Sequence, residues 1–427
     1  MRSSGVLIAA LLAGFACAGC AGTQAPQPAQ QSSVQAPDGR LHDGRFAATA
    51  MVLANGQVLI TGGVATDSTA SAVAEIYDPA KGGFTLTDSL LTGRAYHTAT
   101  LLTNGKVLIA GGIGTDGHPV RASELYDPAS ASFVPTGNMI EPRYDHAATA
   151  LPNGKVLITG GDTTTTQVTN IDSAELYDPA TGTFSATGNV ERFYDPEANQ
   201  FWYQGKMNAV RAKHTATLLT DGKVLIAGGG DASGKAQASA EIYDPASGKF
   251  TPTGSMNNAR REHHATLLSN GEVLMTGGVD ASGQVIATAE LFDPNTGRFR
   301  LTTAAFPTGS NMTQPRYQDT ATLLADGRVL IAGGSYSMTI LDTAELYDPS
   351  RGAFECVGGR ANSAASACNP TMLAQRASAN AVRLADGNVL ILGGLSVSDY
   401  LSSAELYNPQ AGSFTSVAAI VKARYGN

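Results

Sequence analysis

Short apolar runs separated by turn dipeptides recur along most of the chain. The stretch HTATLLTNGKVLIAGG, residues 97–112, places two apolar runs on either side of Asn104-Gly105. This pattern favours a β-hairpin closed by a two-residue type I′ turn. Close copies begin at residues 214, 264 and 319. A recurring unit of this kind indicates a repeat architecture.

Seven copies can be aligned on the Gly-Gly pair that ends the second apolar run. In every copy an Arg precedes the pair by 17 residues, and an Asn-Gly or Asp-Gly lies between them. A Glu follows each pair and opens a third short strand, as in AELYDP. The seven Arg are Arg45, Arg94, Arg143, Arg211, Arg260, Arg316 and Arg376. The seven Glu are Glu75, Glu124, Glu175, Glu241, Glu290, Glu345 and Glu405.

Each copy predicts four antiparallel strands, named a to d here. Strand a reads TATLL, strand b KVLIAGG and strand c AELYDP, and strand d begins at an aromatic Phe. Strand b is apolar on both faces, so it must be covered on both sides. A four-stranded sheet that stacks between copies of itself at a period near 50 residues is typical of a propeller blade.

The Gly-Gly pair, the later Glu-Φ-Tyr (where Φ is apolar) and the aromatic start of strand d resemble the kelch repeat over residues 45–417. The resemblance implies an all-β fold: a seven-bladed kelch-type β-propeller with four antiparallel strands per blade. We assign it to residues 41–427. Kelch propellers include both binding modules and enzymes, so the resemblance does not decide the function.

The first forty residues read as targeting sequence. Residues 5–16 are an apolar run too short to span a bilayer and typical of a signal-peptide core. The following CAGCAG resembles a bacterial lipobox, with Cys17 where Leu is usual. The resemblance implies a signal peptide over 1–19 and lipidation of Cys20; the alternative is plain secretion. Residues 20–40, rich in Gln, Pro, Ala and Ser, predict a disordered tether.

Charge and cysteine content narrow the setting further. The chain has 28 Lys and Arg against 36 Asp and Glu, without a basic cluster. This composition argues against nucleic acid or an anionic membrane surface as partner. We expect a monomer, attached to the membrane only through its lipid, in the bacterial cell envelope, either periplasmic or surface-exposed. Export to an oxidising compartment predicts a disulfide between Cys356 and Cys368.

Strand directions divide the loops between two faces. The a–b and c–d turns share one face, the turn face; the b–c and d–a loops share the other, the loop face. The d–a span is lengthened after blades 3, 5 and 6, and loops on a rigid scaffold commonly carry function. The blade 3 insertion contains the only Trp. Its aromatics either pack a small hairpin onto the blades or form a platform for a sugar ring or a protein. These candidate binding residues are Phe193, Tyr194, Phe201, Trp202 and Tyr203.

Two further sets recur once per blade. His97, His146, His214 and His263 share one position at the start of strand a, held by Asp319 in blade 6 and by Ala48 and Ala379 in blades 1 and 7. Such a set could hold a metal, but a residue that recurs at one repeat position favours a structural role. We therefore expect no metal and no other cofactor. The matching numbers of Arg and Glu predict structural Arg–Glu contacts within or between blades; the alternative is an Arg ring that binds an anionic ligand.

These patterns favour a binding or adhesion module that recognises an unknown protein or glycan through the loop face. The alternative is a carbohydrate-active enzyme, oxidase or epimerase-like, on the same face. It would need two or three titratable groups with perturbed pKa values at the central mouth. Tyr96-His97 resembles the adjacent Tyr-His ligands of copper radical oxidases, which also use a kelch-like propeller. Their Tyr–Cys cross-link needs a free Cys, which a Cys356–Cys368 pair does not leave. No residue is assigned as catalytic.

The C-terminal tail repeats the usual passage from one blade to the next, because Phe414 and Arg424 have the spacing found between blades. This predicts that residues 418–427 cross the loop face toward blade 1 and help to close the ring. The alternative is a frayed tail.

Overall fold

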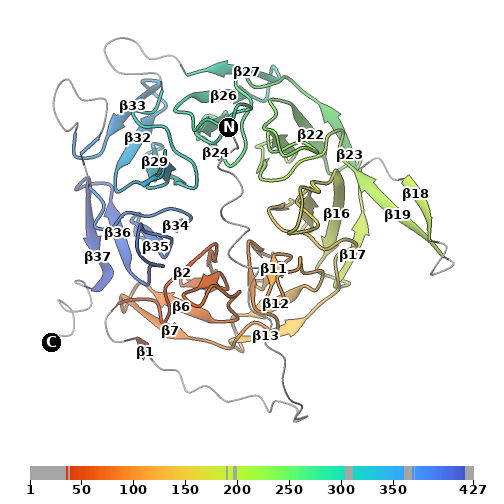
Figure 1. Ribbon diagram of the computed structural model, residues 1–427, viewed down its shortest axis with the longest axis horizontal. Helices are drawn as coiled ribbons and strands as arrows, with labels where there is room; N and C mark the ends of the chain where they lie inside the picture. The colour runs from red at the N-terminus through yellow and green to blue at the C-terminus, as the bar shows by residue number, and fades with distance from the viewer. Residues whose placement is uncertain are drawn as a thin grey trace.

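The computed structural model is a seven-bladed kelch-type β-propeller, in which the blades form a ring around a central axis (Figure 1). It describes residues 35–36, 39–188, 191–195, 200–302, 311–359, 368–369 and 371–418, with the backbone alone for 35–36, 191–195 and 200–204. Among these residues, no helix is long and apolar enough to cross a membrane.

Every blade is a sheet whose four strands follow one another from the axis outward, as the repeat predicts. Blades 1 to 3 consist of β3 (Thr49–Val52), β4 (Val58–Thr61), β6 (Ala74–Asp78) and β7 (Gly83–Leu86); β9 (Thr98–Leu101), β10 (Val107–Ala110), β12 (Glu124–Asp127) and β13 (Ser132–Pro135); and β14 (Ala147–Ala150), β15 (Val156–Thr159), β16 (Ser173–Asp178) and β17 (Thr183–Ala186).

Blades 4 to 7 repeat the same order. They consist of β20 (Thr215–Leu218), β21 (Val224–Ala227), β22 (Ala240–Asp244) and β23 (Lys249–Pro252); β24 (His264–Leu267), β25 (Val273–Thr276), β26 (Ala289–Asp293) and β27 (Arg298–Leu301); β28 (Thr320–Leu323), β29 (Val329–Ala332), β32 (Ala344–Asp348) and β33 (Ala353–Cys356); and β34 (Asn380–Arg383), β35 (Val389–Leu392), β36 (Ala404–Asn408) and β37 (Ser413–Ser416).

Additional short strands lie outside the four-stranded blades. On the loop face, β2 (Arg45–Phe46) pairs with β5 (Val64–Ala65), β8 (Arg94–Ala95) with β11 (Ile113–Gly114), and β30 (Ser335–Tyr336) with β31 (Thr339–Ile340). At the outer edge, β1 (Gln35–Ala36) pairs with β7, which brings two residues of the predicted tether onto blade 1. The hairpin of β18 (Glu191–Asp195) and β19 (Gln200–Lys206) extends from blade 3.

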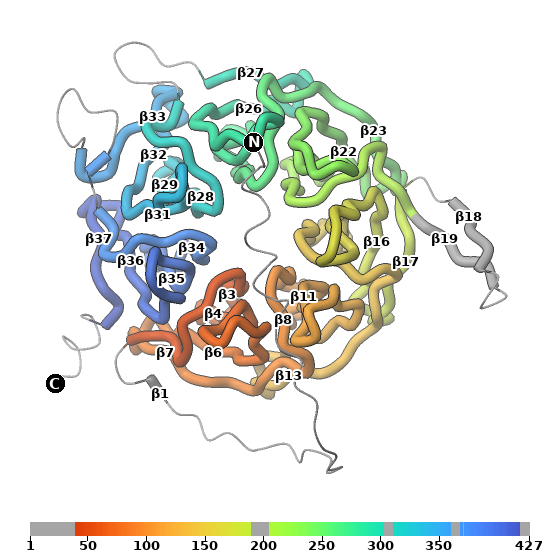
Figure 2. Tube along the Cα trace, viewed as in Figure 1, coloured from red at the N-terminus to blue at the C-terminus, as the bar shows by residue number. Residues whose placement is uncertain are grey.

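The core lies between the blades. Strand b is buried along its whole length in all seven blades, which confirms that both of its faces are covered. Between blades 1 and 2, for example, Leu59 packs in one cluster with Val107 and Ile109. The seven a strands contact one another around the axis (Figure 2). The sheets are therefore held by face-to-face packing, and the start of each strand a is placed at the axis.

The tight a–b turns correct one prediction, because they are not of type I′. In the turn after β3, Gly56 alone has positive φ (83°), whereas a type I′ turn needs two such residues. Gly56 N–H donates to the Leu53 carbonyl and Leu53 N–H to the Gln57 carbonyl, at 2.9 and 2.8 Å. This is a type I turn followed by a glycine bulge. The Asn55 side chain stabilises it by accepting a hydrogen bond from Gln57 N–H at 3.0 Å.

The Gly-Gly pairs lie where one blade meets the next. In blade 1, Gly62 and Gly63 have φ of 60° and 101°. A Cβ on Gly62 would lie 2.3 Å from the carbonyl oxygen of Arg94 in blade 2. That close approach lets Gly63 N–H donate to the same oxygen at 2.9 Å. A side chain on Gly62 would therefore separate the two blades, and one on Gly63 would meet the Phe46 carbonyl within blade 1.

The ring closes between blades 7 and 1 through the same contacts as elsewhere. Gly394 N–H donates to the Arg45 carbonyl and Leu41 N–H to the Ser402 carbonyl, both at 2.8 Å. Leu41 and Val417 are buried in one cluster with strands of both blades. The predicted path of the tail falls on residues 419–427, outside the described residues, apart from Ala418, which lies against Gly39.

Candidate functional site

The repeat Arg and Glu form a buried ion pair within each blade. The N–O distance is 2.6 Å for Arg94–Glu124. The equivalent Arg and Glu pair in the other six blades: Arg45–Glu75, Arg143–Glu175, Arg211–Glu241, Arg260–Glu290, Arg316–Glu345 and Arg376–Glu405. All fourteen side chains are at most 2% exposed. None of these guanidinium groups is therefore presented on the loop face as an anion site.

Each pair joins three elements at the loop-face end of its blade. In blade 2, Arg94 Nη1 donates to the carbonyls of Gly111, after strand b, and Ala122, before strand c, at 3.0 and 2.9 Å. The Glu124 carboxylate accepts the backbone N–H groups of Leu91 and Thr92 in the d–a loop, at 2.7 and 3.1 Å. The pair thereby fixes the path of the d–a loop just before the chain reaches the axis.

Two residues after each Arg, the chain adopts a left-handed conformation. We call these seven residues the axial ring; their φ values lie between 50° and 57°, and none is Gly. They are Ala47, Tyr96, Asp145, Lys213, Glu262, Gln318 and Ser378. Backbone hydrogen bonds link neighbours around the axis, such as Lys213 N–H to the Asp145 carbonyl at 2.9 Å and Glu262 N–H to the Lys213 carbonyl at 3.0 Å. The conformation recurs in every blade, so the packing of the blades imposes it, and the seven side chains are placed around the axis.

Charged groups converge in one sector of the axial ring, formed by blades 3, 4 and 5. Lys213 Nζ lies 2.9 Å from Glu262 Oε1 and 3.8 Å from Asp145 Oδ2. Arg261 Nη1 donates to Glu262 Oε1 at 2.5 Å. The side chains of Asp145 and Glu262 are 18% and 13% exposed, and that of Lys213 is 39% exposed. The cluster is thus partly desolvated but open to the loop face.

Burial and mutual charge perturb these groups in different directions. Desolvation raises the pKa of Asp145 to about 6, and the charge of Lys213 only partly offsets it. Desolvation also opposes ionisation of Glu262, but Lys213 and Arg261 outweigh it and lower its pKa. For Lys213, Glu262 and Asp145 overcome desolvation and raise the pKa. Near neutral pH the cluster therefore contains one readily protonated acid beside a fixed ion pair.

Tyrosines border this cluster. Desolvation, followed by the charge of Asp145, raises the pKa of Tyr96. Desolvation likewise raises the pKa of Tyr144, beside Asp162 and Asp145, and of Tyr317, beside Glu262. Tyr96 also packs edge-on against Phe46, with ring centroids 6.4 Å apart. The sector thus combines hydroxyl groups, aromatic faces and both signs of charge.

The repeated His lie behind the axial ring, in the seams between blades. His97 Nε2 is 3.0 Å from both Thr49 Oγ1 and Thr61 Oγ1 of blade 1. His146, His214 and His263 make similar contacts to Thr98, Thr159 and Thr215. Desolvation lowers the pKa of His97 and His214 to about 3, so both are neutral at pH 7. Among the described residues, no group of three or more His, Cys, Asp or Glu is placed to hold a metal ion.

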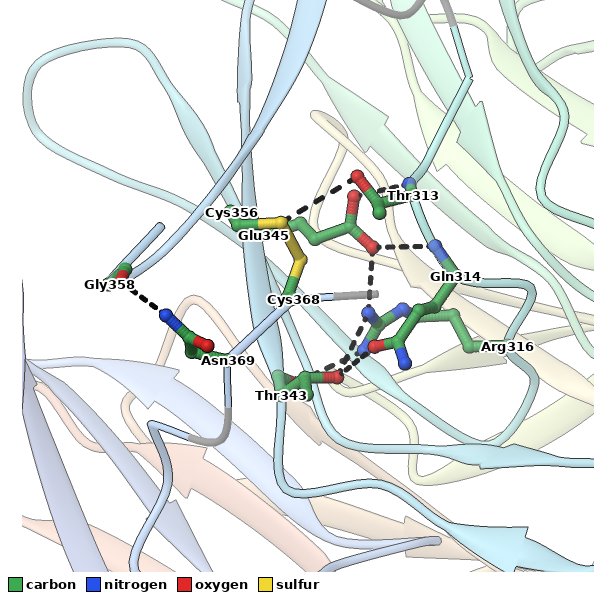
Figure 3. Close-up of a disulfide and its surroundings, with 9 residues drawn as sticks. All are labelled: Thr313, Gln314, Arg316, Thr343, Glu345, Cys356, Gly358, Cys368 and Asn369. Atoms are coloured by element: carbon green, nitrogen blue, oxygen red, sulfur yellow. Dashed lines mark hydrogen bonds and ion pairs between the residues drawn. A yellow bond between two sulfur atoms is a disulfide. The ribbon is translucent and has the colours of Figure 1, made fainter. Parts of the chain in front are cut away.

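The disulfide between Cys356 and Cys368 is present, as the sequence predicts, and it holds the d–a loop after blade 6 (Figure 3). It lies beside the buried pair of that blade, where Glu345 accepts Thr313 N–H at 2.6 Å and pairs with Arg316 at 2.8 Å. The disulfide therefore stabilises the d–a loop at the loop face.

For the predicted aromatic platform, the structure describes the backbone but not the side chains. β18 and β19 pair in a register that places Phe193 opposite Trp202 and Tyr194 opposite Phe201. The hairpin lies at the rim of the ring, away from the axis (Figure 1). The side chains of these residues and of Tyr203 lie outside the described residues, so their proposed binding role stays a prediction.

The sequence analysis missed two repeated sets. The axial ring had a signal, since it falls between the repeat Arg and the repeat His, but its residue types differ from blade to blade. The other set, which we call the seam residues, is buried between neighbouring blades and lies four residues before each Arg. These are Leu41, Leu90, Met139, Met207, Met256, Met312 and Met372. A constant large apolar residue at that spacing was the available signal.

Comparisons with known proteins agree with this fold. Residues 211–257 match the family model described as Kelch motif. No curated protein sequence matches the chain significantly. A solved structure of a fungal alcohol oxidase of the AA5 family, in complex with copper, is similar with a TM-score of 0.60 and 16% identity, over 86% of this chain and 73% of that chain. At that identity the likeness shows the propeller fold alone.

Proposed function

We propose that this kelch propeller is a binding module that captures a protein or glycan on its loop face, with the axial ring as the centre of the contact. The observation that supports it most is the sector of Asp145, Lys213 and Glu262, which is bordered by tyrosines and partly exposed. Binding sites commonly combine a few convergent polar groups with aromatic surface.

The test is capture by the soluble domain, residues 40–427, on a glycan array and from cell-envelope extracts. Glu262→Gln removes the charge that binds Lys213 and Arg261, so we expect it to lower capture about tenfold or more. Glu272→Gln is the matched control, because Glu272 pairs with Arg300 on the turn face. Equal capture by both variants would contradict the proposal. Trp202→Ala tests the hairpin separately: saccharide retention lost in that variant would assign the platform role.

An enzyme on the same face is the second candidate, and the raised pKa of Asp145 favours it. An acid that titrates near pH 6 beside a fixed cation is suited to general acid–base catalysis. If the module is catalytic, saccharide turnover should be lost in Asp145→Asn while capture persists. The AA5 oxidase supports this candidate only through its shared propeller fold.

Export and lipid attachment belong to the same proposal. The disulfide is consistent with an oxidising compartment, and CAGCAG supplies the candidate lipidation site at Cys20. Cys20→Ser should move the protein from the membrane fraction to the soluble fraction. Unchanged membrane association would remove the lipid from the account.

A further inference from the structure

One seam of the propeller carries a histidine–aspartate couple where other seams carry threonine and histidine. At the start of strand a, Thr49, Thr98 and Thr215 each contact a His of the next blade. Between blades 5 and 6, His264 takes the Thr position and Asp319 takes the His position. Both changes occur in the same seam, so the contact is exchanged as a unit.

The couple fixes which ring nitrogen of His264 carries hydrogen. Nε2 lies 2.9 Å from the carbonyl oxygen of Asp319 and 3.9 Å from its Oδ1. A carbonyl oxygen only accepts, so Nε2 must be the donor, and the neutral ring then has its lone pair on Nδ1. The nearby carboxylate favours the same tautomer. His264 is therefore prepared to accept a hydrogen bond through Nδ1.

The two partners differ in how far their side chains are buried. The Asp319 side chain is fully buried, and its two carboxylate oxygens have no hydrogen-bond partner among the described residues. The His264 side chain is 37% exposed. Burying a carboxylate without donors is costly, and the Thr–His contact of four other seams avoids that cost. Packing alone does not account for the exchange.

His264 also lies next to the charged sector of the axial ring. It begins strand a of blade 5, two residues after Glu262, whose carboxylate binds Lys213 and Arg261. The sector offers a carboxylate acceptor, Glu262, and an ammonium donor, Lys213, and the imidazole adds an acceptor two residues after Glu262 in the chain. Sugar hydroxyl groups both donate and accept, so they satisfy such a mixed set, whereas a ligand with only one kind of group leaves part of it unpaired.

We propose that the His264–Asp319 couple is a subsite for a hydroxyl group of a saccharide or other polyol. The ligand hydroxyl donates to His264 Nδ1, and Asp319 is a positioning residue whose backbone carbonyl keeps hydrogen on Nε2. The proposal rests on the proposed function, since it names the ligand class of the same site.

The repeat itself supplies the control variant. The double substitution His264→Thr/Asp319→His installs the residues of the seam between blades 4 and 5, Thr215 and His263, so the fold and melting temperature should be kept or improved. The probes are methyl glucoside and methyl galactoside at millimolar concentration. Imidazole NMR of the domain, with His264 assigned through His264→Gln, reports binding. We expect one of the glycosides to shift the His264 resonance and to bind about tenfold more weakly to the double variant.

A second variant separates the backbone carbonyl of Asp319 from its carboxylate. Asp319→Asn keeps the carbonyl that accepts from His264 Nε2 and removes only the charge 3.9 Å away. The imidazole nitrogen spectrum should therefore still show hydrogen on Nε2 in Asp319→Asn, and glycoside binding should be kept, whereas the double variant loses it. Hydrogen on Nδ1 of His264 in the parent protein would overturn the positioning role.

Three results overturn the subsite: equal glycoside binding by the double variant, glycoside shifts that exclude His264, and no glycoside binding at all. The proposed function is judged separately, by capture that depends on Glu262. If that capture persists when the glycosides fail, the loop face binds a ligand of another class.

Discussion

At the residue scale, the molecule stabilises its seams with repeated polar contacts that are not complete in every blade. The Tyr243 hydroxyl, in strand c of blade 4, lies 2.8 Å from Thr187 Oγ1 of blade 3. Tyr407, at the same repeat position in blade 7, faces the position of Val357 in blade 6, and its buried hydroxyl has no partner among the described residues. The two equivalent tyrosines therefore differ in whether the hydroxyl group has a hydrogen-bond partner.

Removing the two hydroxyl groups should have unequal effects. Tyr243→Phe leaves Thr187 without its partner and should cost about 1 kcal/mol of the free energy of unfolding. Tyr407→Phe removes a group that is already unpaired and should be neutral or slightly stabilising. Denaturant unfolding of both variants measures the difference. Equal losses would mean that the Tyr–Thr contact contributes nothing.

Ionisation of Asp145 should lower the free energy of unfolding as the pH rises. Its pKa is about 6 in the folded protein and about 3.9 when unfolded. Between these values the folded state binds more protons, so its stability falls as the pH rises from about 4 to about 6. Asp145→Asn should then stabilise the domain by about 1–2 kcal/mol at pH 7 and have little effect at pH 4. Asp67 is the control: hydrogen bonds from Thr69 lower its pKa, so Asp67→Asn should not stabilise at pH 7.

The sequence identifies the residues that repeat in identity but not those that repeat only in geometry. The Arg, the Glu and the Gly pairs are constant, so their spacing predicts blades and strands. In the axial ring, Tyr96, Asp145 and Lys213 share a left-handed backbone imposed by the surrounding blades, and their side chains give no common signal. The predicted type of the a–b turns was wrong for a related reason. Asn-Gly is compatible with two turn types, and the Asn side chain selects one of them.

At the element scale, the buried Arg–Glu pairs connect the d–a loop to the ends of strands b and c. In blade 4, Arg211 donates to the Gly228 and Ser239 carbonyls at 2.7 and 2.9 Å, and Glu241 accepts Asn208 N–H at 2.8 Å. A single loss thus leaves a buried charge and several backbone groups unpaired, which costs more than the pair itself contributes.

Arg211→Met should therefore destabilise the domain by about 3–5 kcal/mol. The double variant Arg211→Met/Glu241→Leu should recover part of that loss, since no lone charge remains. Arg300→Met is the control, because Arg300 is 52% exposed in its pair with Glu272, and exposed pairs contribute about 0–1 kcal/mol. If Arg211→Met melts with the parent protein, the pairs are not structural.

At the scale of the whole molecule, closure of the ring depends on the segment before blade 1. Leu41, only 3% exposed, takes the seam position between blades 7 and 1 that Met256 holds between blades 4 and 5. Its backbone and that of Arg45 supply hydrogen bonds that join blade 1 to blade 7. The closing seam is thus formed by the N-terminal entry to the domain.

Leu41→Ala should destabilise the propeller by about 2–5 kcal/mol, as for other buried leucines. Leu91→Ala, at a Leu that is 57% exposed, should change stability by less than about 0.5 kcal/mol. Thermal melting compares the two. If Leu41→Ala behaves like Leu91→Ala, closure rests on other contacts, and deletion of 418–427 then tests the predicted contribution of the tail.

The central claim is that the axial ring on the loop face is the binding surface. Hydrogen exchange of the domain, with and without a ligand retained in the capture experiment, tests it most directly. The account predicts slowed exchange at Tyr96, Lys213 and Glu262 and in the adjoining d–a loops, with the a–b turns around Gly105 and Gly222 unchanged. Protection confined to those turns, or to the rim hairpin of β18 and β19, would contradict it.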